Sequence, residues 1–174
     1  MEIKTPRGTA SYAYVHKPQK AMDPGKQDQY SLTLIWDADD PKLKKLQDAI
    51  VEVATKKFGA KAKQMLEKGQ LRSPLRDGAE KDGTPGYEGK VFLTSRSNDK
   101  PEIVDEDAEP IADPMEFYSG CEARMLLWLF PYDKAGNKGV GAILNGAQKL
   151  GEGERISGRR SARDAFREDD EDMM

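Results

Sequence analysis

The sequence predicts a mainly β fold with inserted helices, in which five strands close into a small Greek-key barrel. One long apolar run, residues 125–130, is followed by a polar turn at 133–137 and a returning segment. Other segments alternate apolar and polar residues with the period of a strand, and only one long segment has helical periodicity. The expected strands are 9–16, 29–37, 90–97, 121–132 and 138–145. A β-sandwich accounts for this strand count almost as well.

The first expected strand has an unusual distribution of side chains. Alternation places Thr9, Ser11, Ala13 and Val15 on the inward face and Tyr12, Tyr14 and His16 on the outward face. Packing beneath a helix is one explanation. The other is a tyrosine platform beside Lys4 and Arg7, because aromatic rings stack on any nucleobase.

The helical insertion covers about residues 40–68, between the second and third strands. Strand 29–37 turns Tyr30, Leu32, Leu34 and Trp36 toward the core. Asp40 then fits an N-cap and Gly59 a C-terminal cap, and a shorter helix follows through residues 65–66. The lysines of the long helix are interpreted as a solvated face rather than a nucleic-acid patch.

The strand at 90–97 has a composition typical of a single-strand binding surface. Val91 and Leu93 are expected in the core, and Lys90, Phe92, Thr94 and Arg96 on the opposite, exposed face. Cations there neutralise phosphates, and the aromatic ring stacks on a base. The preceding segment, 69–89, is expected to be a long irregular loop that exposes Arg76 and Lys81.

The final hairpin contains the most apolar part of the chain. We expect the run 125–130 to be buried on both faces, with Trp128 in the core and Arg124 facing outward. Gly139 and Gly141 in the returning strand indicate either a bulge or bend, or the close approach of a ligand to bare main chain.

The remaining composition argues against catalysis and against membrane insertion. One cysteine and one histidine do not make a usual zinc site, and Cys121 is expected to be a small core residue. The acidic segment 98–114 is interpreted as a turn-rich connection, because its spacing does not match a calcium loop. We expect no enzyme activity, cofactor or metal. The chain has neither a signal-peptide pattern nor an apolar run long enough to span a membrane, so we expect a cytoplasmic protein.

The two ends of the chain differ sharply in charge. Residues 164–174 hold six acidic residues against Arg167 alone, a net charge of −5, whereas residues 1–163 hold 27 basic and 25 acidic residues. A basic cluster, GRRSAR, spans residues 158–163. We therefore expect a domain at 1–157 and a basic, then acidic, disordered tail at 158–174, because adjacent acids repel one another and little apolar surface is present.

Several stretches resemble the phage single-stranded DNA-binding proteins of the Enc34 type, and in fold the T7-like phage single-strand binding proteins. These stretches are TPRGTASY (5–12), RDGAEKDGTPGYEGKVFL (76–93), DPMEFYSGCEAR (113–124), GNKGVGAILNGAQKL (136–150) and GRRSARDAF (158–166). The resemblance implies an OB-fold barrel that binds single-stranded DNA during phage replication and recombination. It also implies a mobile acidic tail that contacts replication partners such as a DNA polymerase or helicase. T7-like tails end in an aromatic residue, whereas this chain ends in Met173 and Met174.

The sequence therefore predicts a non-catalytic protein that binds single-stranded DNA by aromatic stacking and phosphate contacts. The expected DNA-binding residues are Lys4, Arg7, Tyr12, Tyr14, Arg76, Lys81, Lys90, Phe92, Arg96 and Arg124. The expected partner-binding residues of the tail, which also competes with DNA, are Glu168, Asp169, Asp170, Glu171 and Asp172. Two alternatives remain. One is an interaction or regulatory module that acts through its tail, and the other is a metal-dependent nuclease that uses carboxylates in segment 105–113.

Overall fold

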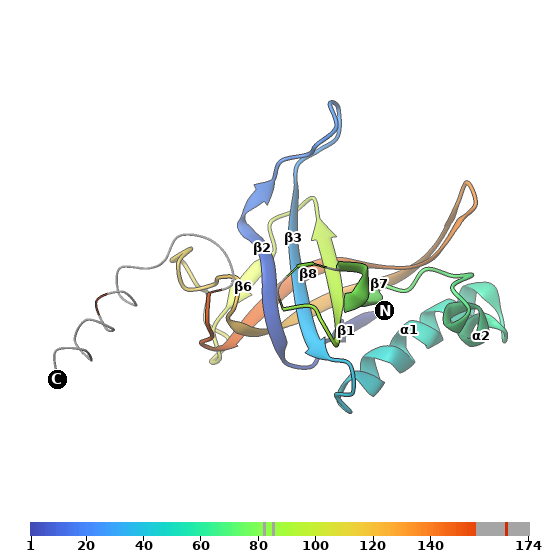
Figure 1. Ribbon diagram of the computed structural model, residues 1–174. Coiled ribbons are helices and arrows are strands. Elements are labelled where there is room, and N and C mark those ends of the chain that lie inside the picture. Colours follow the sequence, from blue (N-terminus) through green and yellow to red (C-terminus); the bar gives the residue numbers. More distant parts are fainter. Residues whose placement is uncertain (82, 85, 156–165, 167–174) are drawn as a thin grey trace.

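The computed structural model describes residues 1–81, 83–84, 86–155 and 166, and these form a predominantly β structure (Figure 1). The strands are β1 (Glu2–Lys4), β2 (Gly8–Gln19), β3 (Gln29–Asp37), β4 (Leu75–Asp77), β5 (Lys90–Ser97), β6 (Glu102–Val104), β7 (Glu122–Lys134) and β8 (Asn137–Gly151). The helices are α1 (Leu43–Phe58) and α2 (Ala62–Glu67), with a 3-10 turn, η1 (Gly78–Lys81). The predicted mainly β architecture with two inserted helices is confirmed. The predicted tail lies outside the described residues except for Phe166, which is exposed.

Five strands pair in a closed circuit. β2 pairs with β3, β3 with β5, β5 with β8, β8 with β7, and β7 pairs again with β2. Every pair is antiparallel except β5–β8, which meets in parallel at Arg96 and Ile143. Alternate side chains of these strands therefore point into one enclosed core or away from it. Figure 1 shows the two helices beside one end of this array and the β2–β3 connection projecting from it.

β7 and β8 form the longest strand pairing, and the structure shows why glycines occur in this hairpin. Ala135 and Gly136 both have positive φ, at 50° and 86°, as a two-residue hairpin turn requires. A Cβ atom added to Gly139 would lie 2.3 Å from the backbone oxygen of Arg72. One added to Gly141 would lie 2.5 Å from the Phe130 ring. The close neighbours of the two glycines are thus the Arg72 backbone and the Phe130 ring of the same chain, which leave no room for a side chain at either position.

The prediction that residues 125–130 are buried on both faces is wrong. Met125, Leu127 and Leu129 lie in the core, whereas Trp128 is 46% exposed. The strand has one buried face because only the interior of the circuit is covered by other strands. The placement of Trp128 in the core is therefore also corrected.

A bulge in β2 reverses its inward and outward positions. Tyr12 has a φ of 47°, and the pairing with β3 shifts register between Ser11 and Tyr14. Ala10 and Val15 consequently both lie in the core although they are five positions apart. The prediction that Thr9 and Ser11 face inward is wrong, since a buried Ser11 instead accepts a hydrogen bond from Tyr87 on the outer face.

The helices follow the predicted pattern with one shift. The apolar stripe of α1 is buried against the core, and Gly59 ends the helix at φ 89° with its N–H donated to Thr55. The helix begins at Leu43 rather than beside Asp40, because the Asp40 carboxylate accepts the N–H of Lys42 in a preceding turn. None of the helices among the described residues has the length and apolar character needed to cross a membrane.

A second, smaller cluster covers part of the outer face of β3 and β5. Tyr87, Phe92 and Ile35 pack together, with Phe92 only 2% exposed. The rings of Tyr87 and Phe92 meet edge to face at 5.3 Å between centroids. The Tyr87 hydroxyl donates to Ser11 Oγ at 3.0 Å. The expected exposure of Phe92 is wrong, because a segment predicted to be irregular loop brings Tyr87 over it.

The cluster predicts that Phe92 supports the fold. Replacing Phe92 with alanine should lower the free energy of unfolding by about 3–5 kcal/mol, because it leaves a cavity beneath Tyr87. Urea unfolding followed by circular dichroism measures this loss. Met115→Ala is the matched control, since Met115 is 51% exposed and its truncation should change stability by less than about 0.5 kcal/mol. A stable Phe92→Ala variant with weakened DNA binding would restore the interpretation of Phe92 as a stacking residue.

Candidate nucleic-acid interface

The expected DNA-binding residues do not form one cluster. Most lie on the outer face of β2, β3 and β5 or on the segments beside it, namely Tyr12, Tyr14, Arg76, Lys81, Lys90, Phe92 and Arg96. Lys4 and Arg124 lie on β1 and β7, and both line a groove with Gln148. Arg7 lies just before β2 and shares another groove with Lys90.

Tyr12 provides the most accessible aromatic ring of the first group. The bulge holds it 43% exposed, and its ring centroid lies 6.5 Å from that of Tyr87. The Lys81 ammonium lies 5.4 Å from the Tyr12 centroid and 5.8 Å from that of Phe92, in position for cation–π attraction. Tyr12 and Lys81 therefore combine an accessible π-face with a positive charge, as stacking on a nucleotide requires.

The cations expected to bind DNA differ in their existing ion-pair partners. Arg76 pairs with Glu80 at 2.9 Å, Lys90 pairs with Asp37, and Arg7 pairs with Glu122. Such exposed ion pairs contribute at most about 1 kcal/mol, so these carboxylates compete only weakly with a phosphate. Arg96 is exposed and has no ion-pair partner within the described part of the chain.

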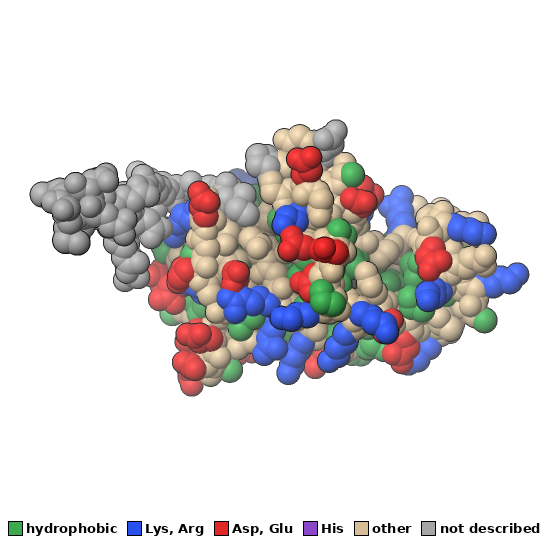
Figure 2. Space-filling view, turned by 60° about the horizontal axis from the view of Figure 1, so that its bottom comes forward, with side chains coloured by type: hydrophobic (Ala, Val, Ile, Leu, Met, Phe, Trp, Pro, Cys, Tyr) green, Lys and Arg blue, Asp and Glu red, His purple; other side chains and the backbone are tan. Residues whose placement is uncertain are grey.

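Two other features limit where DNA phosphates can bind. Burial lowers the pKa of His16, so this outward residue of β2 is neutral at pH 7 and adds no positive charge. Figure 2 shows that basic side chains on the molecular face displayed there are interspersed with acidic ones. In the groove between β1 and α1, for example, three lysines lie among Glu2, Asp48 and Glu52. That mixture matches a solvated surface better than a continuous phosphate track.

The buried Cys121 has the core position that the sequence predicted. Its pKa is raised by burial, which holds the thiol protonated. No group of three or more potential metal-ligating side chains comes together in residues 1–81, 83–84, 86–155 and 166.

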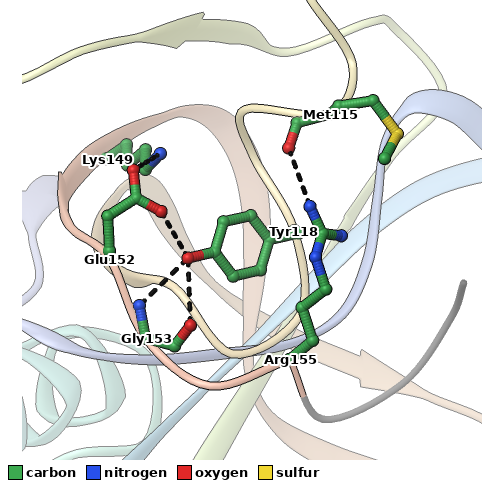
Figure 3. Close-up of polar contacts among 6 residues, drawn as sticks. All are labelled: Met115, Tyr118, Lys149, Glu152, Gly153 and Arg155. Atoms are coloured by element: carbon green, nitrogen blue, oxygen red, sulfur yellow. Dashed lines mark hydrogen bonds and ion pairs between the residues drawn. The ribbon is translucent and has the colours of Figure 1, made fainter. Parts of the chain in front are cut away.

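Sequence reasoning missed an anchor that binds the last described residues of the domain to the barrel (Figure 3). The Tyr118 hydroxyl donates to Glu152 and lies 3.0 Å from both the backbone oxygen and the backbone nitrogen of Gly153. The Arg155 guanidinium lies 4.3 Å from the Tyr118 ring centroid. Burial and the bond to Glu152 raise the pKa of Tyr118 to about 12, so the hydroxyl remains a donor at neutral pH.

The anchor places residues 152–155 beside β2. Gly120, two residues after Tyr118, donates its N–H to Ala10 at 2.8 Å, and Ser119 Oγ accepts the N–H of Ala13. A Cβ atom added to Gly120 would lie 1.9 Å from the backbone oxygen of Glu154, so the two segments are in direct contact. Residues 152–155 are therefore held next to the strand that carries Tyr12. Only long-range contacts reveal this arrangement; the local sequence holds no signal for it.

The whole chain, residues 1–174, matches the family model described as Enterobacter phage Enc34, ssDNA-binding protein. No curated protein matches it significantly. Among solved structures, it is similar to the bacteriophage Enc34 single-stranded DNA-binding protein in complex with ssDNA, with a TM-score of 0.70 and 21% identity over 90% of this chain and 89% of the other. It is also similar to gp2.5, a single-stranded DNA-binding protein of bacteriophage T7, with a TM-score of 0.67 and 16% identity over 92% of this chain and 97% of the other.

Proposed function

Since the chain belongs to the family of the Enterobacter phage Enc34 ssDNA-binding protein, we propose that it binds single-stranded DNA without catalysis and with little sequence preference. The observation that carries this proposal is the exposed Tyr12 ring beside the Lys81 ammonium on the outer face of the strand circuit. Base–aromatic stacking is tolerant of sequence because every base has a π-face. The DNA-bound structure of the Enc34 protein, whose fold is similar, supports the same function.

The proposed barrel is an OB fold. The closed circuit β2–β3–β5–β8–β7, with helices inserted between β3 and β5, supports this assignment. Bases stack on Tyr12 and Tyr14, while phosphates contact the cations of the same face and of the adjoining loops. These cations are Arg7, Arg76, Lys81, Lys90 and Arg96. Lys4 and Arg124 contact phosphates where the bound DNA extends over β1 and β7. Phe92 supports this surface from beneath instead of stacking on a base.

The cellular role we propose is phage DNA replication and recombination in the host cytoplasm. Single strands are exposed whenever a duplex is unwound, and a sequence-tolerant protein covers them. The acidic residues 168–172 contact replication proteins in this proposal. The competing proposal is an interaction module that acts only through its tail. The five consecutive acidic residues at 168–172 favour this module over the second alternative, a nuclease.

Fluorescence polarisation of labelled oligo(dT) and of a duplex of equal length tests the binding function. We expect tighter binding to the single strand, with a site of about 4–16 nucleotides per barrel. Arg96→Ala should weaken binding and make the slope of log affinity against log salt shallower by about one unit, because one phosphate contact is lost. Equal affinity for duplex and single strand at the same salt would contradict the proposal. Absent binding combined with tail-dependent capture of a replication protein would establish the competing function.

The tail, in this proposal, competes with DNA for the cationic face. Residues 152–155 are anchored beside β2, so the tail that follows them in the sequence is tethered to a segment close to Tyr12. A short tether gives an effective concentration on the order of millimolar. Bound DNA then displaces the acids and makes them available to partner proteins.

Deleting residues 168–174 should tighten single-strand binding several-fold at low salt and less at high salt, because salt screens contacts between exposed charges beyond about 10 Å at 0.1 M. The measurement is the same polarisation titration at two salt concentrations. Deleting only Met173 and Met174 is the matched control, since it shortens the chain and retains all five consecutive acids. Equal affinities for the acid-deleted and full-length chains at low salt would refute the competition.

A further inference from the structure

A row of directly paired residues crosses five strands of the circuit. Tyr14 on β2 pairs with Ser31 on β3, and Ser31 pairs with Arg96 on β5. Arg96 then pairs with Ile143 on β8, and Ile143 pairs with Trp128 on β7. We call these five residues the register row. Its members occupy adjacent positions although they come from strands far apart in the sequence.

The register row lies on the outward side of its strands, where Tyr14 is half-buried and Ser31 is covered, at 5% exposed. Each member has at least one buried neighbour along its strand, and among these Val15, Leu32, Leu127 and Leu144 belong to the core. Strand alternation therefore directs Ser31, Trp128 and Ile143 outward. Ile143 is 38% exposed, Trp128 is 46% exposed, and Arg96 is also exposed.

The exposed indole of Trp128 has no explanation in the packing of the described residues. Its neighbours along β7 on the same face, Leu126 and Phe130, are both half-buried. Its cross-strand partner on β1 is Glu2, which is exposed and too small to cover it. An exposed tryptophan beside an exposed isoleucine costs hydration free energy in the isolated protein, and that cost is recovered when a ligand covers the ring.

We propose that Trp128 is a second stacking residue for single-stranded DNA, and that the strand follows the register row from Tyr14 past Arg96 to Trp128. This inference rests on the proposed single-strand binding function. The row places an aromatic ring at each end and, between them, the guanidinium of Arg96, which has no ion-pair partner among the described residues. Single-stranded DNA needs this alternation of stacking and phosphate contact.

The length of the row suits a short single strand. Neighbouring β-strands lie about 4.8 Å apart, so the four steps from β2 to β7 span about 19 Å measured along the backbones. Single-stranded DNA with stacked bases rises about 3.4 Å per nucleotide, so this distance holds about five or six nucleotides, and fewer when the DNA is extended. Both values lie within or near the range of about 4–16 nucleotides that one OB barrel binds.

The two tryptophans of the chain provide a direct readout. Trp36 is 3% exposed and donates its indole N–H to the backbone oxygen of Pro6 at 3.2 Å, so DNA on the outer face does not reach it. Trp128 is the accessible one. Titration of the full-length protein with oligo(dT) of about 12 nucleotides should quench fluorescence that comes from Trp128. Trp128→Phe should lose this quenching while it retains most of the affinity, because phenylalanine still stacks.

Affinity measurements on alanine variants decide whether the ring contributes to binding. Trp128→Ala should weaken binding of the same oligo(dT) roughly fivefold or more, the lower end of the effect of removing one stacked ring. Met115→Ala is the matched control, because Met115 is exposed but lies outside the row, and it should bind as the unmodified protein does. Circular dichroism checks that each variant is folded. We expect Trp128→Ala and Trp128→Phe to fold, because Trp128 is partly exposed.

The outcomes separate this inference from the function on which it rests. Tight binding by the unmodified protein with no loss in Trp128→Ala, or quenching that persists in Trp128→Phe, would overturn the register-row path and leave single-strand binding intact. Absent binding by the unmodified protein would overturn both. If Trp128→Ala instead abolishes association with a replication protein and leaves oligo(dT) affinity unchanged, the ring is a protein-docking residue and the inference is wrong.

Discussion

Closure of the strand circuit between β2 and β7 is the constraint on which the rest of the structure depends. The two strands pair over only Gly8–Ala123 and Thr9–Glu122. Backbone hydrogen bonds from Ala10 to Cys121 and from Gly120 to Ala10 extend the joint. This short seam encloses the side chains of Leu34, Met125 and their neighbours, and it leaves the alternate positions outside. Without it, neither a single core nor a continuous outer face would exist.

The same seam brings together the parts that we connect with DNA binding. Immediately beyond it, the bulge at Tyr12 turns an aromatic ring outward beside Lys81. The Tyr118 anchor holds residues 152–155 against the loop that forms the seam. The Tyr12 surface and residues 152–155, which precede the acidic segment in the sequence, are therefore neighbours because both are attached to one joint. This proximity is the physical basis for the competition between tail and single-stranded DNA that we propose.

Sequence patterns predicted the long elements. They failed where tertiary contacts determine whether a side chain is buried or exposed. The five circuit strands and α1 have many residues with clear periodicity, whereas β1, β4 and β6 have three residues each and too little pattern to detect. For Phe92 the face was predicted correctly, opposite Leu93, but its cover comes from Tyr87 in a glycine-rich segment. An all-apolar run such as 125–130 does not reveal which of its faces another strand will cover, so Trp128 was misplaced. The reversal at Tyr12 depends on a positive φ that tyrosine rarely adopts.

The central claim is that a single strand lies on the outer face of the strand circuit, and photo-cross-linking tests it most directly. Oligo(dT) substituted with bromodeoxyuridine would be irradiated in complex with the full-length protein, and cross-linked peptides identified by mass spectrometry. The account predicts cross-links on β2 at Tyr12 or Tyr14 and on β7 at Trp128, residues exposed or half-buried on that face. Cross-links confined to α1, or to the groove between α1 and β1, would contradict it.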